Sequence, residues 1–283
     1  MGIGALFVGV PIPHLRKKAA RQGWRPACRG LKMTYCVALF LKAGLVMLSD
    51  TRTNAGVDNI STFCKMHRFE TPGERCMVLL TAGNLSISQS VVNRLHEGVS
   101  IGDADPETLA TVPSMFRAAQ LVGAAIRDVY NSDGLAMKAQ GVGFDASFLL
   151  GGQIRGRGMR LFQIYSPGNF IEATPETPYL QIGEHKYGKP ILDRVVSYDT
   201  PVQDGVKLVL VSMDSTLRSN LSVGMPIDLA VYHRDDMQLR IHRRITETDS
   251  YFQHVRDHWS NALRQSYGTL PTADEWWAGE RQV

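Results

Sequence analysis

The order of strand-like and helix-like segments along residues 34–268 limits the fold more than any other feature of this sequence. Strand-like segments, rich in β-branched, aromatic and other apolar residues, come in clusters, and amphipathic helix-like segments separate the clusters. The expected strands are 34–41, 45–50, 65–69, 76–83, 146–152, 159–165, 179–183, 227–232 and 238–242. The expected helices start near residue 84 and cover 113–130, 189–196, 202–217 and 246–267. This order predicts two antiparallel sheets stacked together, with helices outside.

Length and composition exclude several classes of protein. The 283 residues allow one large domain with a closed core, and we find no internal repeat or linker that would divide it. Charged residues at 20% and aromatic residues at 8% argue against disorder and coiled coil, and no apolar run is long enough for a membrane helix. The cysteines lack the spacing of a metal site, which favours buried reduced thiols in a cytoplasmic protein. They are Cys28, Cys36, Cys64 and Cys76.

The positive charge of the chain is concentrated at its beginning. Residues 1–32 hold seven of the 31 basic residues and no acidic residue, so 24 basic and 27 acidic residues remain in 33–283. Such a basic leader has three explanations: a targeting peptide, a nucleic-acid-binding arm, or upstream sequence added by a misassigned start. We therefore divide the chain into a leader or propeptide, 1–33, and a domain with a C-terminal helix and tail, 34–283. Without the leader, nothing in the composition indicates a nucleic-acid partner.

Four short motifs combine residue types that can support nucleophilic catalysis. Thr34 begins the first expected strand, and Asp50 ends the strand that returns from it. Lys65 precedes the next strand, and Gly83 ends a buried one. Each has an ordinary explanation by itself, as a strand former, a turn acid, a solvated charge or a strand terminus.

Taken in order, these motifs resemble the proteasome-type β subunits, and most closely the bacterial ancestral β subunits (Anbu). The segment Asp50-Thr51-Arg52-Thr53 is similar to the Asp-x-Arg-x-Thr segment of that family, and Lys65-Met66 and Ala82-Gly83 fall where its Lys-Ile and Ala-Gly pairs do. The segments 182–190 and 214–224 also look Anbu-like. The resemblance covers nearly all of 33–283 and none of 1–32. It implies the four-layer αββα sandwich of the N-terminal nucleophile hydrolases.

The resemblance assigns a role to each motif. Thr34 would be the nucleophile, and its own α-amine, once free, would be the base that takes the hydroxyl proton. Lys65 would lower the pKa of that amine through its charge, and Asp50 would hold Lys65 in place. The N–H of Gly83 would donate to the oxyanion of the tetrahedral intermediate.

Two departures from the proteasome pattern fall near the expected nucleophile. Glu184 stands where a Gly-Ser-Gly serine is usual, and Asn220 stands in place of a late aspartate. An acid at Glu184 would raise the pKa of the amine, whereas loss of the aspartate would lower it. We expect Ser222 to supply a replacement hydroxyl, and Arg52 to organise its loop by pairing with a carboxylate.

By analogy with the family, four further residues would shape the pocket for the substrate side chain. They are Thr53, Phe63, His67 and Gln89. The histidines do not have metal-ligand spacing, and we expect neither a metal nor an organic cofactor.

The predicted function is that of a threonine-type endopeptidase that acts on peptides or unfolded proteins and assembles into a ring or an open helical ring. Catalysis requires a free α-amine on Thr34, which either a start at Met33 or cleavage after Met33 would provide. Proteasome propeptides usually place glycine before the threonine, so the methionine here favours a misassigned start. Two alternatives stay open: an amidase or amide-bond transferase on the same scaffold, and a catalytically silent assembly subunit. A regulatory ATPase partner is left undefined.

Overall fold

Two five-stranded antiparallel sheets form the centre of the molecule. The computed structural model describes residues 34–54 and 60–277. The first sheet has the order β10-β1-β2-β11-β12, and the second has the order β5-β6-β7-β8-β9. The strands of the first sheet are β1 (Tyr35–Leu41), β2 (Gly44–Asp50), β10 (Tyr179–Gly183), β11 (Ile227–His233) and β12 (Leu239–Ile245). Those of the second are β5 (Met66–Thr71), β6 (Arg75–Gly83), β7 (Ala146–Ile154), β8 (Arg160–Ile164) and β9 (Phe170–Glu172).

Four longer helices, a short third helix and a two-stranded ribbon complete the described part of the chain. The ribbon pairs β3 (Arg52–Asn54) with β4 (Ile60–Thr62). The helices are α1 (Leu85–Glu97), α2 (Met115–Ala139), α3 (Lys189–Val195), α4 (Val202–Ser219) and α5 (Ser250–Gly268), followed by the single turn α6 (Asp274–Trp277). No helix in these described ranges is both long and apolar enough to cross a membrane.

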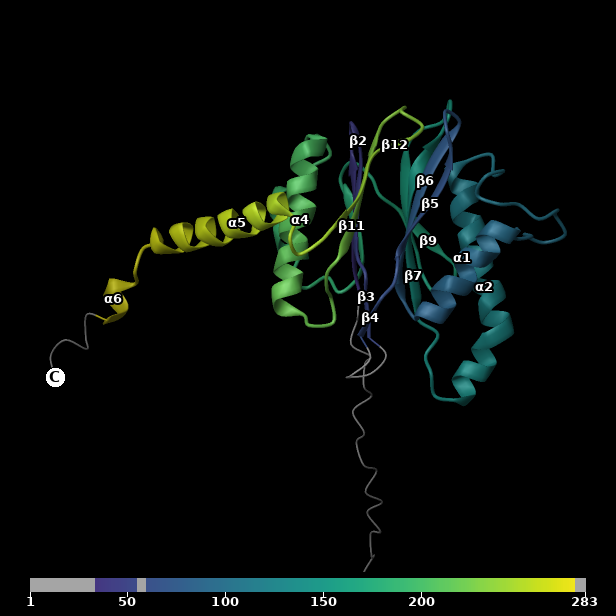
Figure 1. The fold of residues 1–283 in the computed structure, drawn as a ribbon, viewed down its shortest axis with the longest axis horizontal. Coiled ribbons are helices and arrows are strands. Elements are labelled where there is room, and N and C mark those ends of the chain that lie inside the picture. Colours follow the sequence, from purple (N-terminus) through teal and green to yellow (C-terminus); the bar gives the residue numbers. More distant parts are fainter. Residues whose placement is uncertain (1–33, 55–59, 278–283) are drawn as a thin grey trace, which may run out of the picture. The chain divides into compact units, whose positions relative to one another are not determined.

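Three clusters of buried apolar residues hold these elements together. One joins α1 and α2 to the second sheet through residues such as Val91 and Phe148. Another fills the space between the two sheets, with Leu80 on β6 and Ala38 on β1. A third joins the first sheet to α3, α4 and the start of α5. Figure 1 shows α4 and α5 on the side of the first sheet and α1 and α2 on the side of the second.

The first hairpin is buried over its entire length. Every residue of β1 and β2 is buried, because β1 and β2 lie between β10 and β11 and apolar clusters cover both faces of the sheet. An inner strand covered on both faces needs an apolar sequence without alternation, which is what residues 35–48 provide. The antiparallel register pairs Cys36 with Ser49, and so brings the end of β2 beside the start of β1.

The α+β class with two antiparallel sheets is confirmed, while several element boundaries differ from the prediction. Helix α2 continues to Ala139, whereas the sequence predicted its end near residue 130. The Tyr130 ring packs over Gly134, and the Ser132 hydroxyl donates to the carbonyl of Asp128 (3.1 Å). Ser132 and Gly134 are therefore both accommodated within the helix. The short elements β3, β4, β9 and α6 were not predicted, since three or four residues carry too little periodicity.

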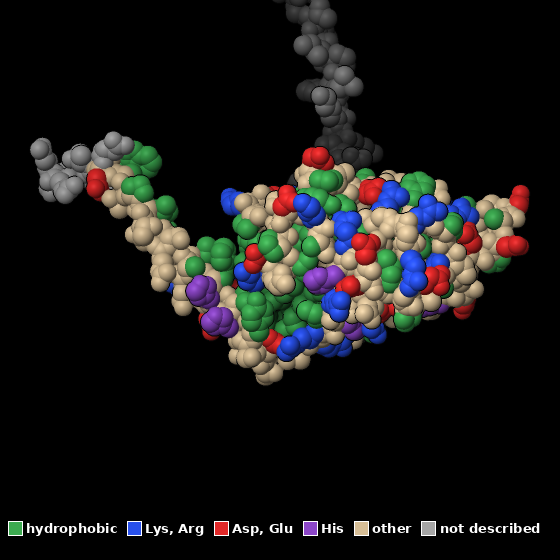
Figure 2. Space-filling view, turned by 90° about the horizontal axis from the view of Figure 1, so that it is seen from above, with side chains coloured by type: hydrophobic (Ala, Val, Ile, Leu, Met, Phe, Trp, Pro, Cys, Tyr) green, Lys and Arg blue, Asp and Glu red, His purple; other side chains and the backbone are tan. Residues whose placement is uncertain are grey.

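Two predictions about cysteines and charge can be compared with the described residues. Cys36 and Cys76 are free and buried as expected, whereas Cys64 is free but exposed. On the face seen in Figure 2, acidic and basic side chains are interspersed around apolar areas. The leader 1–33, with Cys28, lies outside the described residues.

Candidate functional site

Asp50 lies at the junction between the start of β1 and the end of β2. Its Oδ1 atom accepts a hydrogen bond from the backbone N–H of Tyr35 (3.1 Å), the residue that follows Thr34. The antiparallel pairing of β1 and β2 makes this contact possible, because it returns the chain to its starting point after fifteen residues. The Asp50 carboxylate therefore binds the N–H of the peptide bond that joins Thr34 to Tyr35.

Lys65, the residue that precedes β5 of the second sheet, reaches the same carboxylate oxygen. Its Nζ donates to Asp50 Oδ1 (2.8 Å) and to the carbonyl oxygen of Arg52 (2.6 Å). The backbone of Lys65 is held by the N–H of Thr81 on β6 (2.9 Å). Asp50 Oδ1 is thus shared by an ammonium group and by the N–H next to Thr34, which places a positive charge close to the expected nucleophile.

The Asp50–Lys65 pair is almost completely removed from solvent, with side-chain exposures of 0% and 5%. Burial raises the pKa of Asp50, because the charged carboxylate loses its hydration. The Lys65 ammonium and the N–H groups of Tyr35 and Gly224 act in the opposite direction and stabilise the carboxylate. Each of these donors compensates part of the desolvation.

Gly83 ends β6 in a conformation that suits glycine. Its φ is +105°, and a Cβ atom there would lie 2.4 Å from the carbonyl oxygen of Asp145. Successive N–H groups of a strand point to opposite sides in the plane of the sheet. Since the N–H of Asn84 points toward β7 and donates to Asp145 O, the N–H of the preceding Gly83 points away from β7. It therefore points to the same side of β6 as the N–H of Thr81, which donates to the carbonyl oxygen of Lys65.

Glu184 lies directly beside Thr34. Its backbone N–H donates to the carbonyl oxygen of Thr34 (2.6 Å), and the preceding Gly183 approaches Thr34 so closely that a Cβ would lie 2.0 Å from that oxygen. The Glu184 carboxylate is buried and accepts from the N–H groups of His185 (2.9 Å) and Lys186 (3.0 Å). Two backbone donors satisfy one of its oxygens, so this acid is compatible with a position near the nucleophile.

Asn220 joins Glu184 to Ser222. Its Nδ2 donates to Glu184 Oε2 (3.3 Å), and its Oδ1 accepts from the N–H (2.9 Å) and the hydroxyl (2.5 Å) of Ser222. The two positions where the sequence departs from the proteasome pattern are therefore linked by a hydrogen bond. Asn220 was noted as a departure but was not predicted to have this bridging role, and its separation of 36 residues from Glu184 gave no signal.

Arg52 makes a different contact from the one predicted. Its Nη1 donates to the carbonyl oxygen of Leu221 (2.8 Å), and its guanidinium lies against Gly224. Among the described residues no carboxylate pairs with it. Arg52 thus connects the ribbon β3–β4 to the loop after α4, and this loop also supplies the Gly224 N–H that donates to Asp50 Oδ2 (3.4 Å). The prediction that Arg52 organises a loop agrees with this contact, but the expected carboxylate is replaced by a backbone carbonyl.

The four residues predicted to form a substrate pocket come from four separate segments. Thr53 lies on β3, Phe63 follows β4, His67 lies on β5 and Gln89 lies on α1. Phe63 and Gln89 are exposed, and burial lowers the pKa of His67 with a further contribution from His96. Their role as a pocket stays a prediction.

The fold and a strong similarity to solved structures define the class of the protein. Anbu, the ancestral β subunit, from Yersinia bercovieri is 51% identical, with 84% of this chain and 98% of that chain covered and a TM-score of 0.78. A helical assembly of the Anbu complex from Pseudomonas aeruginosa gives the same four values. Anbu from Hyphomicrobium sp. strain MC1 is 50% identical, covers 84% and 99% of the two chains and has a TM-score of 0.77. The fold is therefore of the proteasome β type.

At this identity over nearly the whole length of the solved relatives, the chain belongs to the Anbu family. The family predicted from the ordered motifs is thus confirmed. No family model and no curated protein matches the sequence.

Proposed function

We propose that this protein is a threonine-type endopeptidase in which Thr34, as the first residue of the mature chain, is the nucleophile. The observation that carries the proposal is the shared oxygen of Asp50, which binds both Lys65 Nζ and the N–H that follows Thr34. We also propose that the packing of helices, two sheets and helices is the four-layer αββα sandwich of the N-terminal nucleophile hydrolases.

The chemistry requires a base next to the Thr34 hydroxyl. A free α-amine on Thr34 has an ordinary pKa of about 7.7–8.0, and a nearby ammonium disfavours its protonated form. Lys65 supplies that ammonium, and Asp50 fixes its position. The amine is then available as a base near neutral pH.

The reaction proceeds through an ester of Thr34. The hydroxyl oxygen attacks the substrate carbonyl carbon while its proton moves to the α-amine, and the Gly83 N–H donates to the resulting oxyanion. The C–N bond then breaks, the leaving amine takes the proton, and an acyl-enzyme ester remains. Water attacks this ester with the α-amine again as base, which releases the acid and restores the Thr34 hydroxyl.

Glu184 and Ser222 would act on the same amine through the network centred on Asn220. The Glu184 carboxylate brings negative charge near Thr34, and its two backbone donors limit that effect. Ser222 holds Asn220, and Asn220 holds the second oxygen of Glu184. These three are positioning residues in the proposal.

The active protein would assemble from copies of itself into a ring or an open helical ring in the cytoplasm. The solved Pseudomonas aeruginosa relative is described as a helical assembly. Two buried free thiols, Cys36 and Cys76, agree with a reducing compartment.

The decisive experiment combines chemical labelling with a nucleophile variant. Purified protein whose mass shows Thr34 as the first residue should react with an epoxyketone, which bonds to both the hydroxyl and the α-amine. The variant Thr34→Ala should lose labelling and at least about a thousandfold of peptide turnover, whereas Thr272→Ala, an exposed threonine on the C-terminal segment, should keep both.

The alternatives give different results in the same assay. Hydrolysis of small amides without extended peptides would indicate an amidase on this scaffold. No labelling despite a confirmed free amine would indicate a silent assembly subunit. A mature protein that retains residues 1–33 would contradict the catalytic model.

A further inference from the structure

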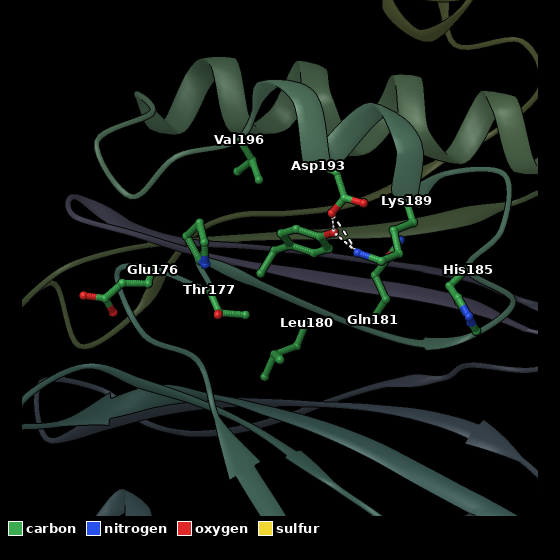
Figure 3. A pocket seen from close by; sticks show the side chains of 10 residues that line it. Glu176, Thr177, Leu180, Gln181, His185, Lys189, Asp193 and Val196 are labelled. Atoms are coloured by element: carbon green, nitrogen blue, oxygen red, sulfur yellow. Dashed lines mark hydrogen bonds and ion pairs between the residues drawn. The ribbon is translucent and has the colours of Figure 1, made fainter.

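A groove of about 480 Å³ follows one edge of the first sheet, between β10 and α3. β10 is the terminal strand of that sheet, with β1 on one side and, among the described residues, no strand on the other. Residues 176–181, which lead into β10 and form its first part, line one side of the groove. His185, Lys189, Asp193 and Val196 line it from the segment that contains α3 (Figure 3).

The open edge of β10 presents backbone hydrogen-bonding groups. Phe40 N–H donates to Pro178 O (2.7 Å), and Glu184 N–H donates to Thr34 O (2.6 Å). In an antiparallel pair, every second residue of a strand bonds to the neighbouring strand and the residues between them point outward. Because Pro178 and Glu184 bond to β1, the N–H and C=O groups of Tyr179 and Gln181 point away from β1. Exposed edge groups of this kind are a template for the addition of another strand.

The Gln181 side chain leaves a further acceptor at the groove. Its Nε2 donates to the Tyr35 hydroxyl (2.8 Å), while its Oε1 is buried and has no hydrogen-bond partner in the described part of the chain. A buried polar atom without a partner costs free energy, and the Gln181 amide must turn toward the groove before a ligand N–H can satisfy it.

The opposite wall is fixed to the strand by a polar contact. Lys189 Nζ donates both to the Tyr179 hydroxyl (2.8 Å) and to Asp193 Oδ1 (2.7 Å), and Figure 3 shows the Lys189 and Asp193 side chains pointing toward one another. An edge strand with a helix fixed beside it is a geometry that binds extended peptides by strand addition.

The direction of β10 connects the groove to the proposed active site. β10 runs antiparallel to β1, so its C-terminal end pairs Gly183 with Tyr35 and lies beside Thr34. From Tyr179 to Gly183 the strand spans roughly 14 Å at about 3.4 Å per residue.

We propose that an extended segment of the polypeptide substrate pairs with the outer edge of β10 as an added strand, several residues from the bond presented to Thr34. This inference rests on the proposed peptidase function. It adds a binding subsite outside the proposed active site, at which an extended polypeptide is held mainly through its backbone, with little dependence on side-chain sequence.

The experiment uses the full chain with Thr34→Ala, so that bound peptide is not cleaved. The probe is a fluorescein-labelled peptide of alternating valine and threonine with a lysine at each end. With residue-resolved hydrogen exchange, saturating peptide should slow exchange of the Tyr179 and Gln181 amides at least tenfold. The Leu180 and Ile182 amides, which already bond to β1, should not change.

Two matched pairs separate backbone pairing from other effects. Gln181→Pro removes an outward N–H without removing a bond to β1 and should weaken peptide binding at least tenfold, whereas Gln181→Ala keeps that N–H and should weaken it about threefold. Two further peptides carry N-methyl groups on alternate residues, one on the odd and one on the even positions. The peptide whose methyl groups replace the N–H groups that face β10 should lose binding, and the other should keep it. The N-methylated series gives the answer even where Gln181→Pro does not fold.

Several results would overturn the inference. The first is unchanged exchange of the Tyr179 and Gln181 amides when peptide is added. The second is an equal loss of binding for the two N-methylated peptides. The third is that the same two amides are already protected in the assembled protein and become exposed on dilution to monomers. The last result would assign the edge to a second copy of the chain. Turnover at Thr34 with no peptide at β10 removes this inference and leaves the proposed function. Peptide at β10 with no labelling of Thr34 removes the proposed function and leaves β10 as a peptide-binding edge.

Discussion

Two lysine–aspartate pairs of almost equal length behave differently in this molecule. Lys65 and Asp50 are 2.8 Å apart with side chains 5% and 0% exposed, while Lys189 and Asp193 on α3 are 2.7 Å apart with both side chains 47% exposed. Burial raises the pKa of Asp50, but hydrogen bonds from Lys189 and Tyr179 lower the pKa of Asp193. The distance between charges is thus less important than the water around them.

The comparison of the two pairs indicates where a charge can affect the protonation of a neighbouring group. An exposed pair on one helix is screened by solvent and mainly supports the local structure. A buried pair keeps its electric field, because little water is present to screen it. The Asp50–Lys65 pair can therefore influence an amine at Thr34, whereas the α3 pair holds the wall of the β10 groove.

Removal of the buried cation should have the largest effect. Lys65→Ala leaves the Asp50 carboxylate buried without its partner, so we expect the free energy of unfolding to fall by about 3–5 kcal/mol. Urea unfolding at neutral pH measures this loss. A loss below about 1 kcal/mol would mean that solvent reaches Asp50 and that the two pairs are equivalent.

Neutralising both members should separate stability from chemistry. The double variant Asp50→Asn/Lys65→Met leaves no unpaired charge, so it should recover about 2 kcal/mol or more of the stability lost in Lys65→Ala. Peptide turnover should stay as low as in Lys65→Ala, because the ammonium near Thr34 is absent. Recovery of turnover in the double variant would contradict the role of Lys65.

The two aspartates should give opposite pH dependences of stability. The raised pKa of Asp50 means that the folded state retains its proton longer, so the contribution of Asp50 falls as pH rises from about 4 through the raised value. The lowered pKa of Asp193 gives a contribution that is present above about 4 and is lost as pH falls through the lowered value. Urea unfolding of Asp50→Asn and Asp193→Asn against the parent protein over this range measures both slopes. Slopes of the same sign would refute the comparison.

Removal of the exposed pair should have the smallest effect. Lys189→Ala should lower the free energy of unfolding by only about 0.3–0.5 kcal/mol, the usual value for an exposed pair four residues apart on a helix. Lys207→Ala, which removes an exposed pair with Asp204 on α4, is the matched control and should also cost under about 1 kcal/mol. A loss at Lys189 as large as that at Lys65 would show that α3 is buried in an assembly.

Long regular elements could be predicted because their periodicity is local. The apolar run of β1 and β2 and the helical spacing of Ile87, Val91 and Leu95 on α1 follow from side-chain patterns within one segment. The predicted end of α2 was wrong. Gly134 usually lowers helix stability, but here the Tyr130 ring packs over it and compensates that loss. The strand β9 was missed, since its pairing with β8 rather than its own three residues defines it.

The candidate site likewise contains residues that the sequence predicted and contacts that it did not. Thr34, Asp50, Lys65 and Gly83 were predicted because the order of their motifs matches a family. Of these residues, the structure shows Lys65 bonded to Asp50, and Asp50 bonded to the N–H that follows Thr34. The Asn220 bridge and the Gly224 N–H were not predicted as contacts, because they join segments 36 and 174 residues apart. No local pattern records such a separation.

Periodicity and ordered motifs along the chain were enough to predict the family, the two-sheet architecture and the residue types available for catalysis. Three further properties are visible only in the folded chain: Asp50 is desolvated, Lys65 and the N–H after Thr34 share one of its oxygens, and β10 has an open edge beside a groove. Burial, shared hydrogen-bond partners and free strand edges arise when distant segments pack together. They are therefore properties of the folded chain and not of any one segment.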